Sequence, residues 1–210
     1  PTNDRVCQLF NLNTGKKIGG RIGSGEGPNE MIMPMFVSNG KGIQLIDMAS
    51  ATVYQYDLKN FLSEDSPNPL LKLKLSESVD SEMQMLGEHY LGYQYSKEDL
   101  LYLFNKQGQK IKSFAGFPDG EIDSPNEQRA DMYQMGYISN GKDRVAITYY
   151  MTDVIEIFDA EGKLIRHLQG PENFEYEIGK DAFFSPKNAD DSFFVLYNGR
   201  NRNEKDHNSS

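Results

Sequence analysis

One stretch of this sequence occurs twice, at an offset of 101 residues. Residues 37–41 read Val-Ser-Asn-Gly-Lys, and residues 138–142 read Ile-Ser-Asn-Gly-Lys. After one inserted residue the likeness continues, with Val-Tyr-Gln-Tyr-Asp at 53–57 and Ile-Glu-Ile-Phe-Asp at 155–159. Self-similarity at a fixed spacing is typical of folds that place one supersecondary unit after another.

A shorter unit recurs within that spacing and predicts a β-hairpin. Each copy has an aromatic residue followed by Asn or Asp, then in most copies a Gly and a second apolar run; the aromatic residues are Phe10, Tyr56, Phe104 and Phe158. The Asn or Asp side chain accepts hydrogen bonds from the turn backbone, and Gly tolerates positive φ. The turn after Tyr56 is longer and lacks the Gly. The repeat is therefore about 50 residues long.

The residues around these turns have the alternation of β-strands. Glu156, for example, is polar between the apolar Ile155 and Ile157, which indicates a strand with one buried face. Gly- and Pro-rich connections separate the hairpins, at 23–28, 116–120 and 170–172. Four short strands in a repeat of about 50 residues are typical of a β-propeller blade. We predict an all-β fold of four-stranded antiparallel blades, with one helical turn within 76–85.

Several of these segments resemble the TolB-like six-bladed propeller proteins common among Bacteroidetes. The segments are 23–30 (Gly-Ser-Gly-Glu-Gly-Pro-Asn-Glu), 43–57, 86–93, 117–118 and 194–200. The resemblance covers nearly the whole chain. It implies an envelope protein in the periplasm or on the cell surface, secreted or lipid-anchored, whose function is mostly unassigned.

Length and chain ends predict an incomplete propeller. At about 50 residues per blade, the chain holds about four blades, whereas the resembling family has six. We expect residues 1–200 to form one incomplete β-propeller domain and residues 201–210 to form a polar tail or loop. We also expect flanking sequence or a partner chain to cover the open blade faces, and a targeting segment with a lipid anchor to have been lost before Pro1.

Charge and composition exclude several partners. The formal net charge is −9 and the isoelectric point is about 4.9, so nucleic acid and anionic membrane surfaces would be repelled. The sequence has no apolar stretch long enough for a transmembrane helix, which needs about 18 residues. Cys7 is the only cysteine and alternates with Leu9, so we expect a buried, free and unreactive thiol.

Three features raise the question of a cofactor or metal. The loop 23–30 is rich in glycine, but it lacks the spacing of a phosphate-binding loop. Met31, Met33 and Met35 occupy alternate positions, and thioethers at this spacing can bind Cu(I) on one face of a strand. Thioethers more often fill space in a core. The histidines His89, His167 and His207 have no metal-ligand spacing. We therefore assign no cofactor, metal ligand or catalytic residue.

Carboxylates follow several strand-like runs, at Asp47, Asp57, Asp153 and Asp159. The central channel of a propeller can gather such groups around Ca²⁺. The positions of Asp57 and Asp159 favour turn formation instead.

Strand ends and loops at the rim of such a scaffold are where ligands bind. The residues we select on this criterion are Arg21, Glu30, Tyr149 and Arg200. The predicted function is an extracytoplasmic module that binds a protein or a small carbohydrate-like ligand without catalysis. The alternative is a hydrolase or lyase that acts on a lactone, ester or glycan with a divalent metal in the channel.

Overall fold

The computed structural model describes residues 5–38, 40–94, 99–116, 135–149, 152–171, 180–183, 186–189 and 192–201. Strands dominate these residues, as predicted. In chain order the elements are β1 (Arg5–Phe10), β2 (Lys17–Ser24), β3 (Glu30–Met31), β4 (Pro34–Ser38), β5 (Ile43–Asp47), β6 (Thr52–Tyr56), α1 (Leu58–Ser63), β7 (Leu71–Lys74), β8 (Met83–Leu86), β9 (His89–Tyr93), β10 (Leu101–Phe104), β11 (Lys110–Phe114), β12 (Met135–Ser139), β13 (Arg144–Tyr149), β14 (Val154–Asp159), β15 (Leu164–Gln169), β16 (Lys180–Phe183), β17 (Lys187–Ala189), β18 (Ser192–Phe194) and β19 (Tyr197–Asn201).

Most strands pair with their neighbours in the chain. The strands β4 to β7 are consecutive and antiparallel, and so are β8 to β11 and β12 to β15. The first two groups form one eight-stranded sheet, because β4 and β8 pair in parallel through Val37 with Met83 and Ser38 with Gln84. The third group is a separate four-stranded sheet, and β1, β2 and β3 form a three-stranded one. Two further pairs, β16 with β19 and β17 with β18, follow near the end.

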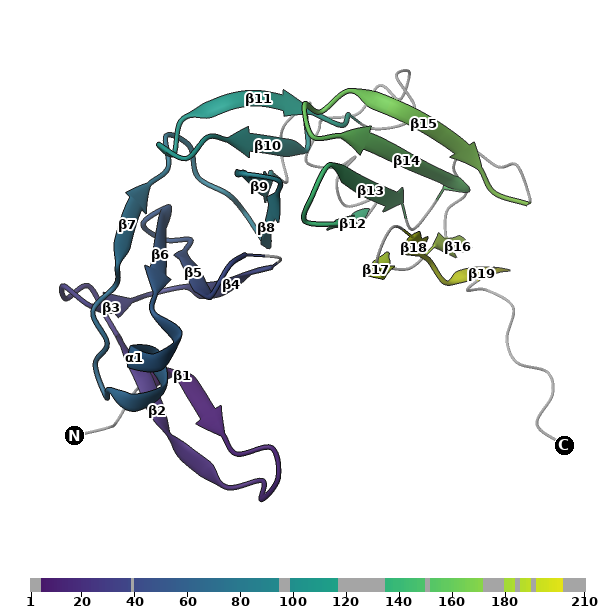
Figure 1. Cartoon of the computed structure of the whole chain (residues 1–210). Coiled ribbons are helices and arrows are strands. Elements are labelled where there is room, and N and C mark those ends of the chain that lie inside the picture. The colour runs from purple at the N-terminus through teal and green to yellow at the C-terminus, as the bar shows by residue number, and fades with distance from the viewer. Residues whose placement is uncertain are drawn as a thin grey trace, which may run out of the picture.

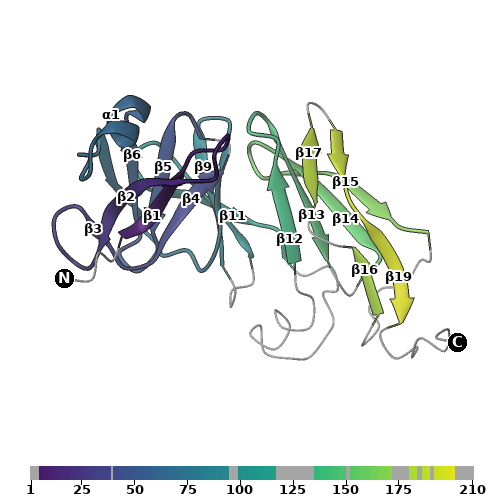
Figure 2. The same ribbon diagram turned by 90° about the horizontal axis from the view of Figure 1, so that it is seen from below.

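The sheets follow one another along an arc. Figure 1 shows β4, β8 and β12 on the concave side of this arc, and β7, β11 and β15 on the convex side. The view from below shows β12 running along the axis about which the sheets curve (Figure 2).

Three apolar clusters fill the spaces between successive groups of strands. Cys7, Ile22 and Phe61 belong to the cluster between β1–β3 and the β4–β7 group. The second cluster lies between β4–β7 and β8–β11, and the third lies between β8–β11 and β12–β15. Successive side chains of a strand point to opposite faces, so Leu45 enters the first cluster and Ile46 the second. The inner strands of the two middle groups, such as β5, β9 and β10, are thus buried on both faces, which explains why aromatic and aliphatic residues are so frequent there.

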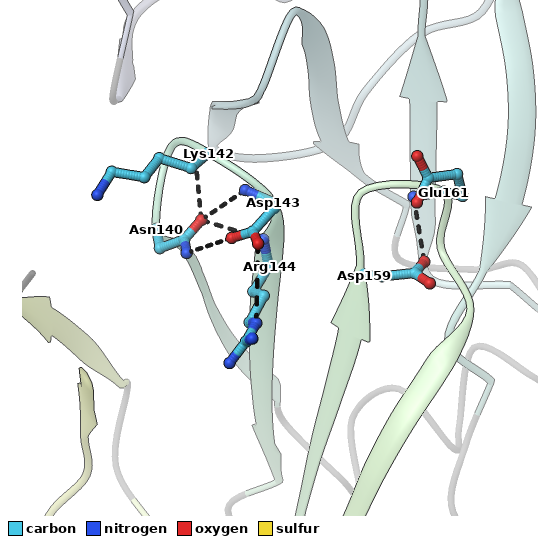
Figure 3. A network of polar contacts seen from close by, with 6 residues as sticks. All are labelled: Asn140, Lys142, Asp143, Arg144, Asp159 and Glu161. Carbon is cyan, nitrogen blue, oxygen red and sulfur yellow. Dashed lines mark hydrogen bonds and ion pairs between the residues drawn. The ribbon is translucent and has the colours of Figure 1, made fainter. Parts of the chain in front are cut away.

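The repeated hairpins have the predicted turn chemistry. The side-chain Oδ1 of Asn105 accepts hydrogen bonds from the backbone N–H groups of Gln107 and Gln109, at 2.9 and 3.0 Å. The Oδ1 of Asp159 likewise accepts from the N–H groups of Glu161 and Lys163, at 3.1 and 2.8 Å; Figure 3 shows the bond to Glu161. The pairing register shifts at the same place in three hairpins, at Phe10, Phe104 and Phe158.

The glycines of two such turns touch the preceding group of strands. Gly108 has φ +76°, and a Cβ there would lie 2.3 Å from the backbone oxygen of Lys74 in β7. Gly162 has φ +69°, and a Cβ there would lie 2.5 Å from the ring of Phe114 in β11. Glycine is therefore needed both for the turn and for the close approach of neighbouring groups.

The prediction of a helical turn within 76–85 is wrong. Residues 76–82 have no regular structure and are followed by β8, because their backbone groups bond to other elements. Ser76 donates to the backbone oxygen of Gly108, and Asp80 donates to that of Tyr93, both at 2.8 Å. Of the expected polar tail, Asn201 ends β19, and residues 202–210 lie outside the described residues.

The helix α1 occupies the long turn after Tyr56 instead. Asp57 caps its N-terminus, because the Oδ1 of Asp57 accepts a hydrogen bond from the N–H of Asn60 at 2.9 Å. Phe61 is buried and packs edge-on against Tyr56, with ring centroids 5.2 Å apart. Within the described ranges, no helix is long and apolar enough to cross a membrane.

Candidate ligand-binding cleft

A cleft of about 340 Å³ lies where turns from three groups of strands meet. We call it the Gln44 cleft. Its polar side chains are those of Lys41, Gln44, Gln55, Glu88, Tyr90 and Lys106. The β12–β13 turn adds Gly141. Because these residues come from separate repeats, only the assembled sheets bring them together.

The β12–β13 turn beside this cleft is held by its own side chains. Figure 3 shows Asn140 accepting hydrogen bonds from the N–H groups of Lys142, Asp143 and Arg144. These donors lie 2.9, 3.0 and 3.0 Å from its Oδ1 atom. The Nδ2 of Asn140 also donates to the Asp143 carboxylate at 2.9 Å. The turn that carries Gly141 is therefore held by hydrogen bonds within itself.

Gln44 is the residue of this cleft whose hydrogen bonding is incomplete. Gln44 is 7% exposed, and its Oε1 atom has no hydrogen-bond partner among the residues that the structure describes. The strand pairing places Gln44 directly opposite Gln55, and the Gln44 amide packs on Gly40, where a Cβ would lie 2.7 Å from Oε1. A buried polar atom without a partner costs about 1–3 kcal/mol. The Oε1 atom has almost no accessible surface and lies against Gly40, so a ligand's donor group reaches it only when the Gln44 amide turns toward the cleft.

Charged side chains surround the opening of the cleft. The Nζ of Lys106 lies 2.8 Å from the Oε2 of Glu88. The hydrogen bond and the charge of Lys106 hold the pKa of Glu88 below its usual value, and Lys41 contributes in the same direction. All three side chains are exposed, so the ion pair positions the groups more than it stabilises the fold.

Apolar surface completes the site. Leu71 and Met85 line the cleft beside Tyr90. Burial raises the pKa of the Tyr90 phenol, so this group is neutral at physiological pH. The cleft thus combines an apolar wall, a phenol, two amides and a charged opening.

A second cleft of about 280 Å³ lies beside the glycine-rich loop and is acidic. Its carboxylates bind their own backbone: Glu30 accepts from the N–H of Gly27 at 3.0 Å, and Asp47 accepts from the N–H of Met33 at 2.8 Å. A Cβ at Gly25 would lie 2.3 Å from the Glu30 carboxylate. The glycines therefore make room for Glu30, and its carboxylate takes the Gly27 amide that a phosphate would need.

Other metal and cofactor interpretations also lack a matching geometry. Met31 and Met35 pack in different clusters, and Met33 is exposed, so their sulfurs do not converge. Among the residues that the structure describes, no three His, Cys, Asp or Glu side chains are grouped as metal ligands. His207 lies outside these residues.

The structure does not bring the four sequence-selected residues together. Arg21 is 3% exposed, and its guanidinium donates to the backbone oxygens of Gly20, Phe61 and Leu62 at 3.0, 2.7 and 2.6 Å. Glu30 lines the second cleft. Arg200 lies opposite Asp181 in the β16–β19 pair, and its side chain lies outside the described part of the chain.

Tyr149 is fully buried between two sheets. Its hydroxyl lies 3.0 Å from the backbone oxygen of Gly116 and 3.0 Å from the Oε2 of Glu156. The Oε1 of Glu156 in turn lies 3.3 Å from the Nδ1 of His167. This chain of contacts lies apart from the residues that line the Gln44 cleft.

Sequence reasoning missed the residues of the Gln44 cleft. One signal was present, because Lys41 ends the repeated Ser-Asn-Gly-Lys segment. The strand pair 43–47 and 52–56 would also have placed Gln44 opposite Gln55, as the structure does. Nothing in the sequence places Glu88 and Lys106 beside them.

No family model matches the chain, and no curated protein matches it. Among solved structures it is similar to the computationally designed Ika8 protein, with 14% identity over 90% of this chain and 52% of that chain and a TM-score of 0.44. It is also similar to a Bacteroides fragilis protein described as exported, with 17% identity over 75% of this chain and 43% of that chain and a TM-score of 0.45. KlHsv2 with loop 6CD replaced by a Gly-Ser linker matches with 14% identity, over 90% of this chain and 67% of that chain, and a TM-score of 0.41. The chain spans about half the length of the first two proteins.

Proposed function

We propose that this chain is an extracytoplasmic binding module that holds a small carbohydrate-like ligand in the Gln44 cleft and does not transform it. In this proposal the groups β4–β7, β8–β11 and β12–β15 are blades of a TolB-like six-bladed propeller. Their antiparallel order and their placement along an arc support that interpretation. The location in the periplasm or on the cell surface, with or without a lipid anchor, follows from the sequence resemblance.

The observation that carries the proposal is the Oε1 of Gln44, which has no hydrogen-bond partner in the described part of the chain. It requires a donor, and a sugar hydroxyl both donates and accepts hydrogen bonds. While one hydroxyl donates to Gln44, others can accept from the amide of Gln55 or the ammonium of Lys41. The apolar face of a sugar ring fits the wall formed by Leu71 and Met85. The volume of about 340 Å³ is at the small end of ligand pockets.

The charges of the cleft favour binding over hydrolysis. Glycoside hydrolysis uses two carboxyl groups on either side of the bond that breaks. Glu88 is the one acidic side chain among the described residues that line this cleft. Its carboxylate is exposed and paired with Lys106, which keeps it ionised and unsuited to act as a general acid.

The substitution Gln44→Leu tests the proposal, because it removes the acceptor and keeps the volume. We expect binding of saccharides, measured by calorimetry with a panel of neutral and acidic sugars, to weaken by about tenfold or more. We expect the free energy of unfolding to stay equal or to rise by about 1 kcal/mol, since the variant buries no unpaired oxygen. Gln8→Leu is the matched control, because Gln8 is exposed on β1 and should change neither quantity.

Two outcomes would contradict the proposal. One is a panel in which no sugar binds the wild-type chain. The other is equal affinity for wild-type and Gln44→Leu chains. A gain in stability together with a loss of binding is the signature of a residue kept for function at the cost of the fold.

A further inference from the structure

We infer that the saccharide bound in the Gln44 cleft carries a carboxylate, as a uronic acid does, and that Lys41 and Lys106 bind this group. The inference rests on the proposed function, since it names the class of sugar that the same cleft takes. Gln44 would accept a hydrogen bond from a ligand hydroxyl at the inner wall, while the two ammonium groups meet the carboxylate at the opening.

The charge of the cleft is opposite in sign to that of the whole chain. The chain carries −9, so its overall field repels anions. The described side chains that line the Gln44 cleft nevertheless include two lysines and one glutamate. The second cleft is lined by Glu26, Glu30 and Asp47 and by no basic side chain of the described part of the chain. The positive opening thus distinguishes the Gln44 cleft from the second cleft.

The lysines retain donors for a ligand. Lys106 is held by Glu88 at 2.8 Å, which uses one of the three donors of its ammonium group. Lys41 has no ion-pair partner among the described residues, although it lies near enough to Glu88 to lower its pKa. One ammonium group is therefore oriented and the other is uncommitted, and together they can bind the two oxygens of a carboxylate.

The composition of the opening favours a carboxylate over a phosphate. Two cations and one anion leave one net positive charge, which matches a monoanion. A phosphate group carries nearly two negative charges at neutral pH and is commonly bound by the planar fork of arginine. The described residues that line this cleft include no arginine.

The experiment compares galacturonate oligosaccharides with the matching neutral galactose oligosaccharides, using calorimetry on the full chain. We expect the uronates to bind at least about tenfold more tightly at 0.1 M salt. This difference should shrink at 1 M salt, where the screening length falls from about 10 Å to about 3 Å. Lys41→Gln and Lys106→Gln should each weaken uronate binding by about fivefold, a larger loss than either causes for the matching neutral sugar.

Glu88→Gln gives a result of opposite sign. It removes the anion that competes with the ligand, so the uronate should bind more tightly and the neutral sugar equally well. Lys16→Gln is the control for the loss of a positive charge, because Lys16 is exposed in the β1–β2 turn and does not line the cleft. It should leave every affinity unchanged.

The outcomes separate this inference from the proposed function. One outcome is equal binding of uronate and neutral sugar, with no effect of the lysine substitutions and a clear effect of Gln44→Leu. This outcome contradicts the inferred ligand carboxylate and agrees with the proposed sugar site. Binding of galactose 6-sulfate as tightly as galacturonate also contradicts the inference that the site selects a carboxylate. Failure of every sugar to bind overturns both.

Discussion

Arg21 completes the last turn of α1 from a distant part of the sequence. The final carbonyl groups of a helix have no partner within the helix, and here the guanidinium of Arg21 donates to the backbone oxygens of Phe61 and Leu62. Its positive charge is also favourable at that end of the helix dipole. This buried arginine therefore supports the fold, and each of its three guanidinium nitrogens donates to a backbone oxygen.

We expect Arg21→Gln to lower the free energy of unfolding by about 2–4 kcal/mol, because it leaves buried carbonyl oxygens unpaired. Urea unfolding measures this change. Arg166→Gln is the control, since the Arg166 side chain is exposed and, among the described residues, donates only to the neighbouring Ile165 oxygen at 2.8 Å. Equal effects of the two substitutions would show that the contacts of Arg21 with the helix carbonyl groups contribute nothing to the free energy of unfolding.

Cys7 provides a chemical test of packing at the same scale. The thiol is buried between sheets, and burial raises its pKa, so both access and the reactive thiolate are reduced. We expect a thiol reagent to label the native chain at least about a hundredfold more slowly than the urea-unfolded chain. Labelling at the unfolded rate would place the thiol at the surface.

At the scale of elements, two glycines distinguish turn geometry from contact between sheets. Gly15 and Gly108 both have positive φ, at +66° and +76°. A Cβ at Gly15 would meet nothing within 4 Å, whereas at Gly108 it would lie 2.3 Å from the Lys74 oxygen. An alanine at either position would therefore suffer the same backbone strain, but only an alanine at Gly108 would also clash with a neighbouring strand.

We expect Gly15→Ala to cost about 1–2 kcal/mol of unfolding free energy from the left-handed backbone alone. Gly108→Ala should cost a further 1–3 kcal/mol or so, because the backbone of β7 must move. Thermal or urea unfolding of the two variants gives the difference. Equal costs would mean that the β10–β11 turn does not press against β7.

The elements also show how far the sequence can predict this structure. The hairpins at Asn105 and Asp159 were predictable, because their turns depend on side chains only two to four residues away. The six-residue helix α1 was not, because it is too short for a helical period and is held by Phe61 and by Arg21 from β2. The Gln44 cleft was not predictable either, since its residues meet only after three groups of strands have packed.

At the scale of the whole molecule, neighbouring groups of strands are joined in two different ways. The β4–β7 and β8–β11 groups share backbone pairing between β4 and β8. Between β8 and β12 the Gln84 side chain takes this place: its Nε2 donates to the Tyr137 oxygen at 3.2 Å, and its Oε1 accepts from the Ser139 N–H at 2.7 Å. The hydroxyl of Ser139 also donates to the Met85 oxygen at 2.6 Å.

We expect Gln84→Leu to loosen the β12–β15 sheet selectively. The substitution leaves a buried N–H and a buried carbonyl unpaired, at a cost of about 2–4 kcal/mol. Hydrogen exchange followed by mass spectrometry should show faster exchange in β12–β15 and unchanged exchange in β5–β7. Gln8→Leu serves again as the exposed control. A uniform increase along the whole chain would mean that the two groups unfold as one unit.

The two kinds of joint have different consequences for how such a protein changes over evolutionary time. Main-chain pairing, as between β4 and β8, uses atoms that every residue except proline supplies, so a duplicated unit inserted there would pair largely regardless of its sequence. The contact between β8 and β12 depends on Gln84 and on a serine facing it. A single codon change can remove it, and a new copy placed there must bring both side chains. The first joint therefore tolerates gain and divergence of repeats, whereas the second restricts which neighbours a repeat can have.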